Sequence, residues 1–153
     1  NFGSEGYIIS YNYDGNEVLA SPLKPHFWRA PVDNDRGYGM GVRLGYWQGL
    51  EDSMRTKDFA VKQKEGEVVV TASKVLKQRK GTINLEYSVF KSGAIDVYLG
   101  LQPRGGLPDL PKFGMQTKLS VGFDRVIYYG RGPFETYVDR KNSGYVGLFD
   151  YSI

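Results

Sequence analysis

Alternation of apolar and polar residues between positions 59 and 102 is the feature that most restricts how this chain can fold. A period of two is typical of a β-strand with one dry face and one wet face. Gly66 and Ser92-Gly93 mark tight turns between the alternating segments, and residues 78–81 form a longer polar turn. The sequence therefore predicts an antiparallel meander built from residues 61–65, 68–76, 83–91 and 94–102.

Further strand patterns lie on both sides of the meander. Residues 7–11 form an extended apolar segment, Asp14-Gly15-Asn16 is a hairpin turn, and residues 17–23 return along it. Pro22 and Pro25 restrict the next stretch to an edge or irregular strand. Twelve Tyr and eight Phe against three Met also favour strands over helices. The predicted class is all-β, in two antiparallel layers, with later strands at residues 112–120, 125–129 and 144–149.

Composition excludes several kinds of function. The chain has no cysteine and one histidine, which excludes disulfides, thiolate chemistry and a multi-histidine metal site. We expect His26 to hydrogen-bond within an aromatic setting. No apolar run reaches the ~18–20 residues of a membrane helix. A net charge of +3 is mild, so we predict neither nucleic acid nor membrane as a partner. We expect a solvated hairpin end at the densest basic cluster, which is Lys74, Lys77, Arg79 and Lys80.

The first distinctive motif spans residues 25–37. Pro25 and Pro31 fix the backbone around an aromatic pair and an arginine, and a dense polar run follows. That order is typical of a strand that leaves the core and ends in a functional loop. Beyond it, residues 37–52 are rich in glycine and predict a long loop, with a short helix near residues 44–54 as an open alternative. Gly37 is the predicted hinge of this loop.

The second motif spans residues 130–141 and follows a strand and a Gly-x-Gly-Pro turn. One interpretation is a buried polar network that fixes a corner between sheets, because buried charge needs a partner. The other is a sugar-binding surface in which an aromatic ring stacks on a pyranose. The residues concerned are Arg131, Phe134, Glu135, Tyr137, Asp139 and Arg140.

Both motifs contain paired carboxylates, which are what glycoside hydrolysis requires. Asp33 with Asp35, or Glu135 with Asp139, have suitable sequence spacings. Each pair has an arginine neighbour, however, and a close arginine lowers the pKa of a carboxyl and suits a permanently ionised group. We therefore interpret these acids as charge-paired scaffolding. A calcium loop is a weaker alternative, because Leu44 stands where the bidentate glutamate belongs.

Residues 27–37 (FWRAPVDNDRG) and 129–140 (YGRGPFETYVDR) resemble the C-terminal "small chain" domain of the large lactose-splitting β-galactosidases of glycoside hydrolase family 2. The resemblance implies an antiparallel supersandwich of the galactose mutarotase type. It implies that residues 1–153 are the N-terminal part of that domain, cut from a longer enzyme. It also implies that this enzyme removes terminal β-D-galactosyl residues with retention.

The same resemblance places the catalytic glutamates and the magnesium ligands in a central barrel, so no catalytic residue, metal or cofactor is expected in this chain. The implied partners are the remaining domains of the enzyme and a β-galactoside at its cleft. Strands missing from the sandwich would leave exposed sheet edges through which two copies could pair. By motif, the loop that borders the cleft is Asp33, Asn34, Asp35, Arg36 and Gly37.

Two other classes stay open. A stand-alone carbohydrate-binding module needs an exposed aromatic platform, for which Phe134, Tyr137 and Trp47 are candidates. A mutarotase-like epimerase needs a histidine and a glutamate as an acid–base pair, and a chain with His26 alone offers little support for it. The sequence leaves the natural galactoside, the oligomeric state and the cellular compartment open.

Overall fold

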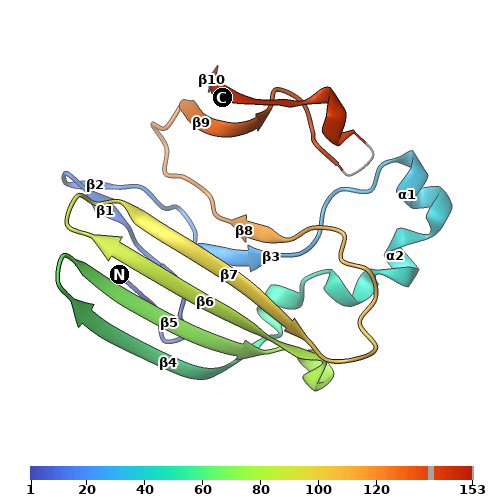
Figure 1. The fold of residues 1–153 in the computed structure, drawn as a ribbon, viewed down its shortest axis with the longest axis horizontal. Helices are drawn as coiled ribbons and strands as arrows, with labels where there is room; N and C mark the ends of the chain where they lie inside the picture. The colour runs from blue at the N-terminus through green and yellow to red at the C-terminus, as the bar shows by residue number, and fades with distance from the viewer. Residues whose placement is uncertain (138–139, 153) are drawn as a thin grey trace. The chain divides into compact units, whose positions relative to one another are not determined.

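The computed structural model describes residues 1–137 and 140–152 and forms two compact units, Asn1–Lys118 and Leu119–Ile153. The class is mostly β, with antiparallel sheets and a few short helical turns (Figure 1). Within the described ranges, no helix is both long and apolar enough to cross a membrane.

A four-stranded antiparallel meander dominates the first unit, as the alternation predicted. Its strands lie in sequence order and pair over nearly their full lengths. The first strand lies at one edge of the sheet, and all ten of its residues are exposed. That strand begins at Arg55, well before the predicted residue 61. The earlier start has no local signal, because residues 55–60 show no clean alternation of apolar and polar side chains. The strands are β4 (Arg55–Lys64), β5 (Glu67–Val75), β6 (Gly81–Phe90) and β7 (Ile95–Pro103).

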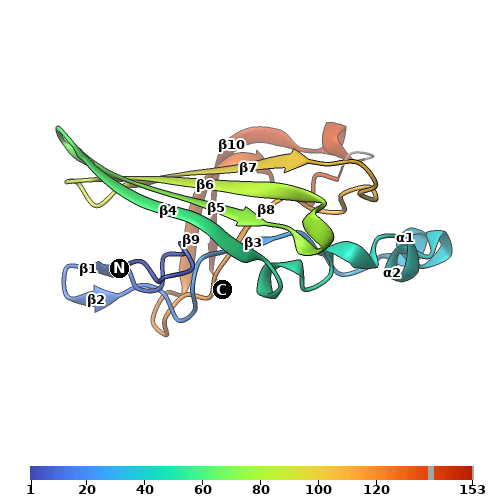
Figure 2. The ribbon, with the colours of Figure 1, turned by 90° about the horizontal axis from the view of Figure 1, so that it is seen from below.

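One face of this sheet carries the hydrophobic core. Alternate residues of β5 and β6 are buried there, namely Val70, Ala72, Ile83, Leu85 and Tyr87. The segments that precede the meander lie along one side of it in Figure 2. They contribute the buried side chains that complete the core: Tyr7, Ile8, Phe27, Met40, Leu44, Trp47, Leu50 and Met54.

The N-terminal segment forms less regular structure than predicted. Residues 7–11 form no strand, and Ile8 makes isolated bridges to Phe2 and Leu23 while its side chain is buried. The hairpin turn at Asp14-Gly15 is confirmed, with both residues at positive φ. It joins β1 (Asn12–Tyr13) to β2 (Asn16–Glu17).

The proline-rich stretch and the later strand at residues 112–120 meet in a short two-stranded ladder. β3 (Lys24–His26) pairs with β8 (Gly114–Gln116), so that Pro25 lies opposite Met115. This agrees with the prediction of an edge or irregular strand, because proline lacks the N–H that a central strand needs. The predicted strand at residues 112–120 is therefore shortened to three residues.

The predicted loop over residues 37–52 is instead a chain of short helical turns. Its buried residues Met40, Leu44, Trp47 and Leu50 recur every three or four positions, which is the period of a helix. The turns are interrupted where Gly39 and Gly49 adopt left-handed φ of 75° and 64°. They are α1 (Asp33–Tyr38), α2 (Met40–Arg43), η1 (Gly45–Trp47) and η2 (Leu50–Asp52).

The second unit is a hairpin of β9 (Arg125–Gly132) and β10 (Tyr145–Ser152), with a 3₁₀ turn, η4 (Lys141–Ser143), before its second strand. One face stacks Tyr128, Phe149 and Tyr151, with ring centroids 5.2–6.5 Å apart. The strands extend past the predicted residues 125–129 and 144–149 because the pairing continues to Gly132 and Ser152.

Lys74 departs from its expected place on a solvated hairpin end. Its side chain lies on the core face and is 1% exposed. The ammonium donates hydrogen bonds of 2.9 Å to the Glu5 carbonyl and to Thr56 Oγ1, and it lies 4.2 Å from the Tyr7 ring centroid. Burial lowers the pKa of Lys74, opposed by Glu5 and reinforced by Lys24.

We predict that the buried Lys74 makes stability depend on pH. Because its pKa is lower in the folded chain, the unfolded chain binds more protons, and stability rises as pH increases toward the ordinary lysine pKa. Urea titrations at pH 7 and pH 9.5 should show this rise in wild type and a smaller one in Lys74→Met. Lys62→Met, which removes the same charge from exposed β4, serves as the control. Equal pH dependence in wild type and Lys74→Met would contradict the prediction.

Candidate functional site

The first motif is organised by an ion pair between Arg29 and Asp35, which we call the Arg29–Asp35 clamp. The guanidinium donates to both carboxylate oxygens, with 2.8 Å between Nη2 and Oδ1. Both side chains are mostly buried, at 22% and 16% exposure. The same carboxylate accepts the Val32 backbone N–H at 2.9 Å, so it holds the start of α1 as well as the arginine.

The clamp fixes the ionisation of Asp35. The hydrogen bonds from Arg29 lower the pKa of this carboxyl most, and the bond from the Val32 N–H lowers it further. Hydrogen bonds to the charged form and a nearby cation both favour ionisation. Asp35 is therefore an acceptor and an anchor, as its arginine neighbour predicted.

The rest of the predicted loop lies on an exposed helix. Asp33 pairs with Arg36 at 2.9 Å, and both side chains lie mostly in solvent. Asn34 and Gly37 are exposed as well. Gly37 lies inside α1 without a positive φ, so the hinge predicted there lacks the backbone conformation on which it rested; the neighbouring glycine with left-handed φ is Gly39, at the end of the helix. The exposed side chains of α1 carry carboxylate, amide and guanidinium groups.

His26 lies in a polar pocket of about 410 Å³ that Lys24, Glu51 and Asp52 also line. Lys112 Nζ lies 3.0 Å from His26 Nδ1, and an ammonium can only donate, so the imidazole nitrogen accepts. Burial lowers the pKa of His26 and Lys112 lowers it further, against the opposing effect of Glu51. His26 is thus hydrogen-bonded, as the sequence analysis expected, but the pocket that it lines is polar, and none of the described residues in its lining is Phe, Tyr or Trp.

Sequence reasoning missed the carboxylates beside the single histidine. Glu51 shares the pocket of His26, and its Oε2 is buried with no hydrogen-bond partner in the part of the chain that the structure describes. Asp52 forms an ion pair with Lys24 at 3.0 Å. These groups meet because η2 packs against β3, and no local pattern links residues so far apart in the sequence.

The second motif lies in the second unit and is exposed there. Arg131 donates hydrogen bonds to the carbonyls of Lys141 at 3.2 Å and Gly144 at 2.8 Å, which ties down the connection between β9 and β10. Glu135 and Arg140 pair at 3.7 Å, with both side chains at least half exposed. Asp139 lies outside the described residues. The predicted network is therefore partly present, but within this unit it is a surface feature.

The aromatic candidates for a sugar platform differ in accessibility. Phe134 is 59% exposed and Tyr137 is 36% exposed, so their rings are open to a ligand within this unit. Trp47 is 1% exposed, and its Nε1 donates to the Pro108 carbonyl at 3.1 Å. Burial in the core removes Trp47 from the candidates.

The described acidic side chains of the two motifs are engaged in ion pairs. Asp33, Asp35 and Glu135 are each paired with an arginine. For Asp35, the lowered pKa favours the ionised carboxylate over the protonated form that a general acid needs. Over residues 1–137 and 140–152, no cluster of three or more His, Asp or Glu side chains could hold a metal ion.

The chain is similar to a known protein family and to several known proteins. A family model described as "Beta galactosidase small chain" matches residues 2–153. The chain is 32% identical over 149 residues to a beta-galactosidase of Priestia megaterium, with 97% of this chain and 14% of the relative covered. It is 34% identical over 150 residues to a beta-galactosidase of Lactobacillus delbrueckii subsp. bulgaricus, with 97% and 15% covered.

A shorter relative is named "Beta-galactosidase small subunit" and comes from Latilactobacillus sakei. It is 29% identical over 174 residues, with 94% of this chain and 54% of the relative covered. The chain therefore spans about half of the small subunit and 14% to 15% of the two longer relatives.

We predict that Asp35→Asn destabilises the first unit more than Asp33→Asn, because of the two acids only Asp35 anchors a partly buried arginine and a backbone N–H. Asp35→Asn should lower the thermal unfolding midpoint by several degrees at pH 7, while Asp33→Asn should leave it nearly unchanged. The pKa of Asp35 is lowered in the folded chain, so its contribution is lost as pH falls through that value. The unfolding midpoint of Asp35→Asn should therefore approach that of wild type below about pH 4. A difference in midpoint that stays constant with pH would contradict this.

Proposed function

The chain belongs to the beta-galactosidase small-chain family, and from this premise we propose that it is a non-catalytic, structural part of a beta-galactosidase. The observation that carries the proposal is the Arg29–Asp35 clamp. The clamp commits Asp35, the most buried carboxylate of the first motif, to holding α1 in place. This acid therefore has a structural role and is unavailable for proton transfer.

The proposed role is to shape the cleft in which the enzyme removes terminal β-D-galactosyl residues with retention. α1 presents Asn34, Arg36 and Asp33 on an exposed surface. Such groups donate and accept hydrogen bonds to sugar hydroxyls. The clamp would fix their direction toward a β-galactoside. The magnesium that the family uses is assigned to the catalytic barrel, and no residue of this chain is proposed to bind it.

The proposed architecture is a galactose mutarotase-like supersandwich to which both units contribute. The meander buries one of its faces. The β9–β10 hairpin stacks aromatic rings on one face and has exposed apolar residues on its opposite face. A two-stranded hairpin is marginal by itself in water, which supports a larger sheet around it. Partners would be the other domains of the enzyme or, as the name of the Latilactobacillus relative suggests, a large chain.

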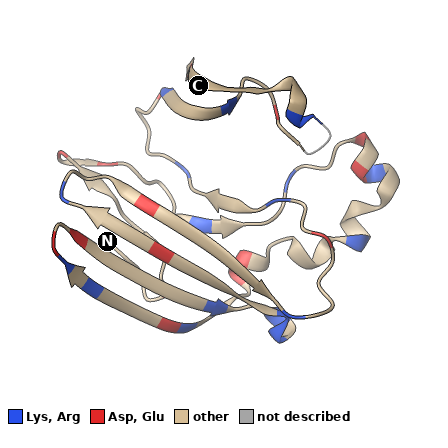
Figure 3. Ribbon diagram, viewed as in Figure 1, with Lys and Arg blue, Asp and Glu red and all other residues tan. Residues whose placement is uncertain are grey.

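Pairing of two copies through the exposed edge strand β4 is opposed by charge. Basic residues recur along β4 (Figure 3). In the antiparallel register that overlaps two β4 strands fully, Arg55 would face Lys64 and Lys57 would face Lys62. Like charges directly across a ladder are destabilising, and lysines commonly protect edge strands in this way. We therefore do not assign a β4 dimer to the chain.

A carbohydrate-binding module is the second candidate, and the exposed rings of Phe134 and Tyr137 favour it. Aromatic faces that stay open to solvent are typical of sugar-binding platforms. Binding of this kind would be compatible with a place in a beta-galactosidase, but it would give the isolated chain an affinity of its own.

We predict that purified residues 1–153 do not hydrolyse a chromogenic β-galactoside, and turnover by the pure chain would contradict the structural role. A galactose titration followed by NMR separates the two candidates. We expect no saturable shifts. Saturable binding that Phe134→Ala and Tyr137→Ala abolish would replace the structural role with that of a binding module.

We also predict that Arg36→Ala, made in the full-length enzyme that carries this chain, raises KM for a β-galactoside by about three- to tenfold with a smaller change in kcat. That range corresponds to the loss of one hydrogen bond to the substrate. Lys62→Ala on the exposed strand β4 is the control and should leave KM unchanged. An unchanged KM in Arg36→Ala would contradict the placement of α1 at the cleft.

A further inference from the structure

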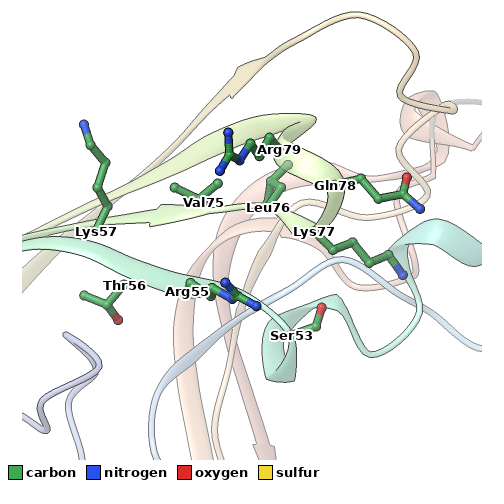
Figure 4. Close-up of a pocket in the computed structure, with 9 residues that line it drawn as sticks. All are labelled: Ser53, Arg55, Thr56, Lys57, Val75, Leu76, Lys77, Gln78 and Arg79. Carbon is green, nitrogen blue, oxygen red and sulfur yellow. The ribbon is translucent and has the colours of Figure 1, made fainter.

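A basic groove of about 530 Å³ lies where β4 begins and where η3 (Lys77–Arg79) connects β5 to β6. Four of its lining residues are cations, Arg55 and Lys57 from β4 and Lys77 and Arg79 from the turn (Figure 4). None of its lining residues is acidic. The groove belongs entirely to the first unit and is separate from both sequence motifs.

Three of the four cations have no acidic partner among the described residues. Lys57 pairs with Asp58 at 3.4 Å. Within the described part of the chain, no ion pair includes Arg55, Lys77 or Arg79. Lys77 is held in place by the Tyr46 ring, whose centroid lies 4.8 Å from its Nζ. Cations gathered in a concave surface without counter-charges focus a positive potential that attracts anions.

The backbone of the turn is a second, independent observation. Gln78 and Arg79 are consecutive non-glycine residues with left-handed φ of 57° and 56°. Such a conformation is sparsely populated for side chains of this kind and often marks a functional site. Here it brings the Gln78 amide and the Arg79 guanidinium into the lining of the groove.

We propose that this groove binds a small, multiply charged oxyanion of the phosphate class. Guanidinium groups donate two hydrogen bonds in a fork that matches phosphate oxygens, and the groove offers two of them from separate segments. Its volume lies within the range of small-molecule sites. No aromatic side chain lines it for base stacking, which argues against single-stranded nucleic acid. This site does not depend on the role assigned to the two motifs.

Calorimetric titration of residues 1–153 with diphosphate at low ionic strength tests the site. We expect saturable one-to-one binding that weakens as sodium chloride is added. The variant Arg55→Gln/Arg79→Gln should bind about tenfold more weakly or worse, because it removes both guanidinium forks. Lys62→Gln/Lys91→Gln removes the same charge outside the groove and should bind within about twofold of wild type, as expected for screened distant charges.

Several results would overturn the proposal. Equal weakening in the two double variants would show general electrostatic attraction, and the absence of saturation would show no site. Tighter binding of hexaglutamate than of diphosphate would make the groove a docking surface for an acidic segment. If Arg55→Gln/Arg79→Gln fails to fold by circular dichroism, Arg55→Lys/Arg79→Lys keeps the charge and removes only the forks. That variant should still bind several-fold more weakly, and unchanged affinity would contradict the proposal.

Discussion

Burial of one face of the meander is the constraint on which the first unit depends. Alternate residues of β5 and β6, such as Ile83 and Leu85, are almost completely buried, and each apolar Å² removed from water contributes roughly 25 cal/mol. That face determines where Tyr7, Phe27 and Trp47 pack, and so where the N-terminal segment and the helical turns lie. The first motif begins at Phe27, which makes its position a consequence of the core.

Two charged groups at the margin of this core have specific partners. Lys74 occupies a position that alternation would give to an apolar residue, and hydrogen bonds with an aromatic ring compensate for its burial. The Arg29–Asp35 clamp does the same where the chain leaves the core. The basic groove differs, because three of its four cations, Arg55, Lys77 and Arg79, form no ion pair with the described residues.

The sequence predicted features with a local signal and missed those created by tertiary packing. The alternation predicted the meander, and the neighbouring arginines predicted that Asp33 and Asp35 are charge-paired. The glycines suggested a loop, whereas burial of residues such as Met40 and Leu44 at helical spacing produced short helices. The neighbourhood of His26 and Glu51, and the burial of Lys74, arise from segments distant in sequence, so no local pattern showed them.

The central claim is that the carboxylates of this chain hold structure and do not transfer protons. The most direct test is an NMR titration of the Asp35 side-chain carboxyl carbon in the folded chain. The account predicts a pKa below the ordinary value of 3.8, because Arg29 and the Val32 N–H both bind the ionised form. A pKa near 6, which is typical of a general acid in a glycosidase, would contradict it.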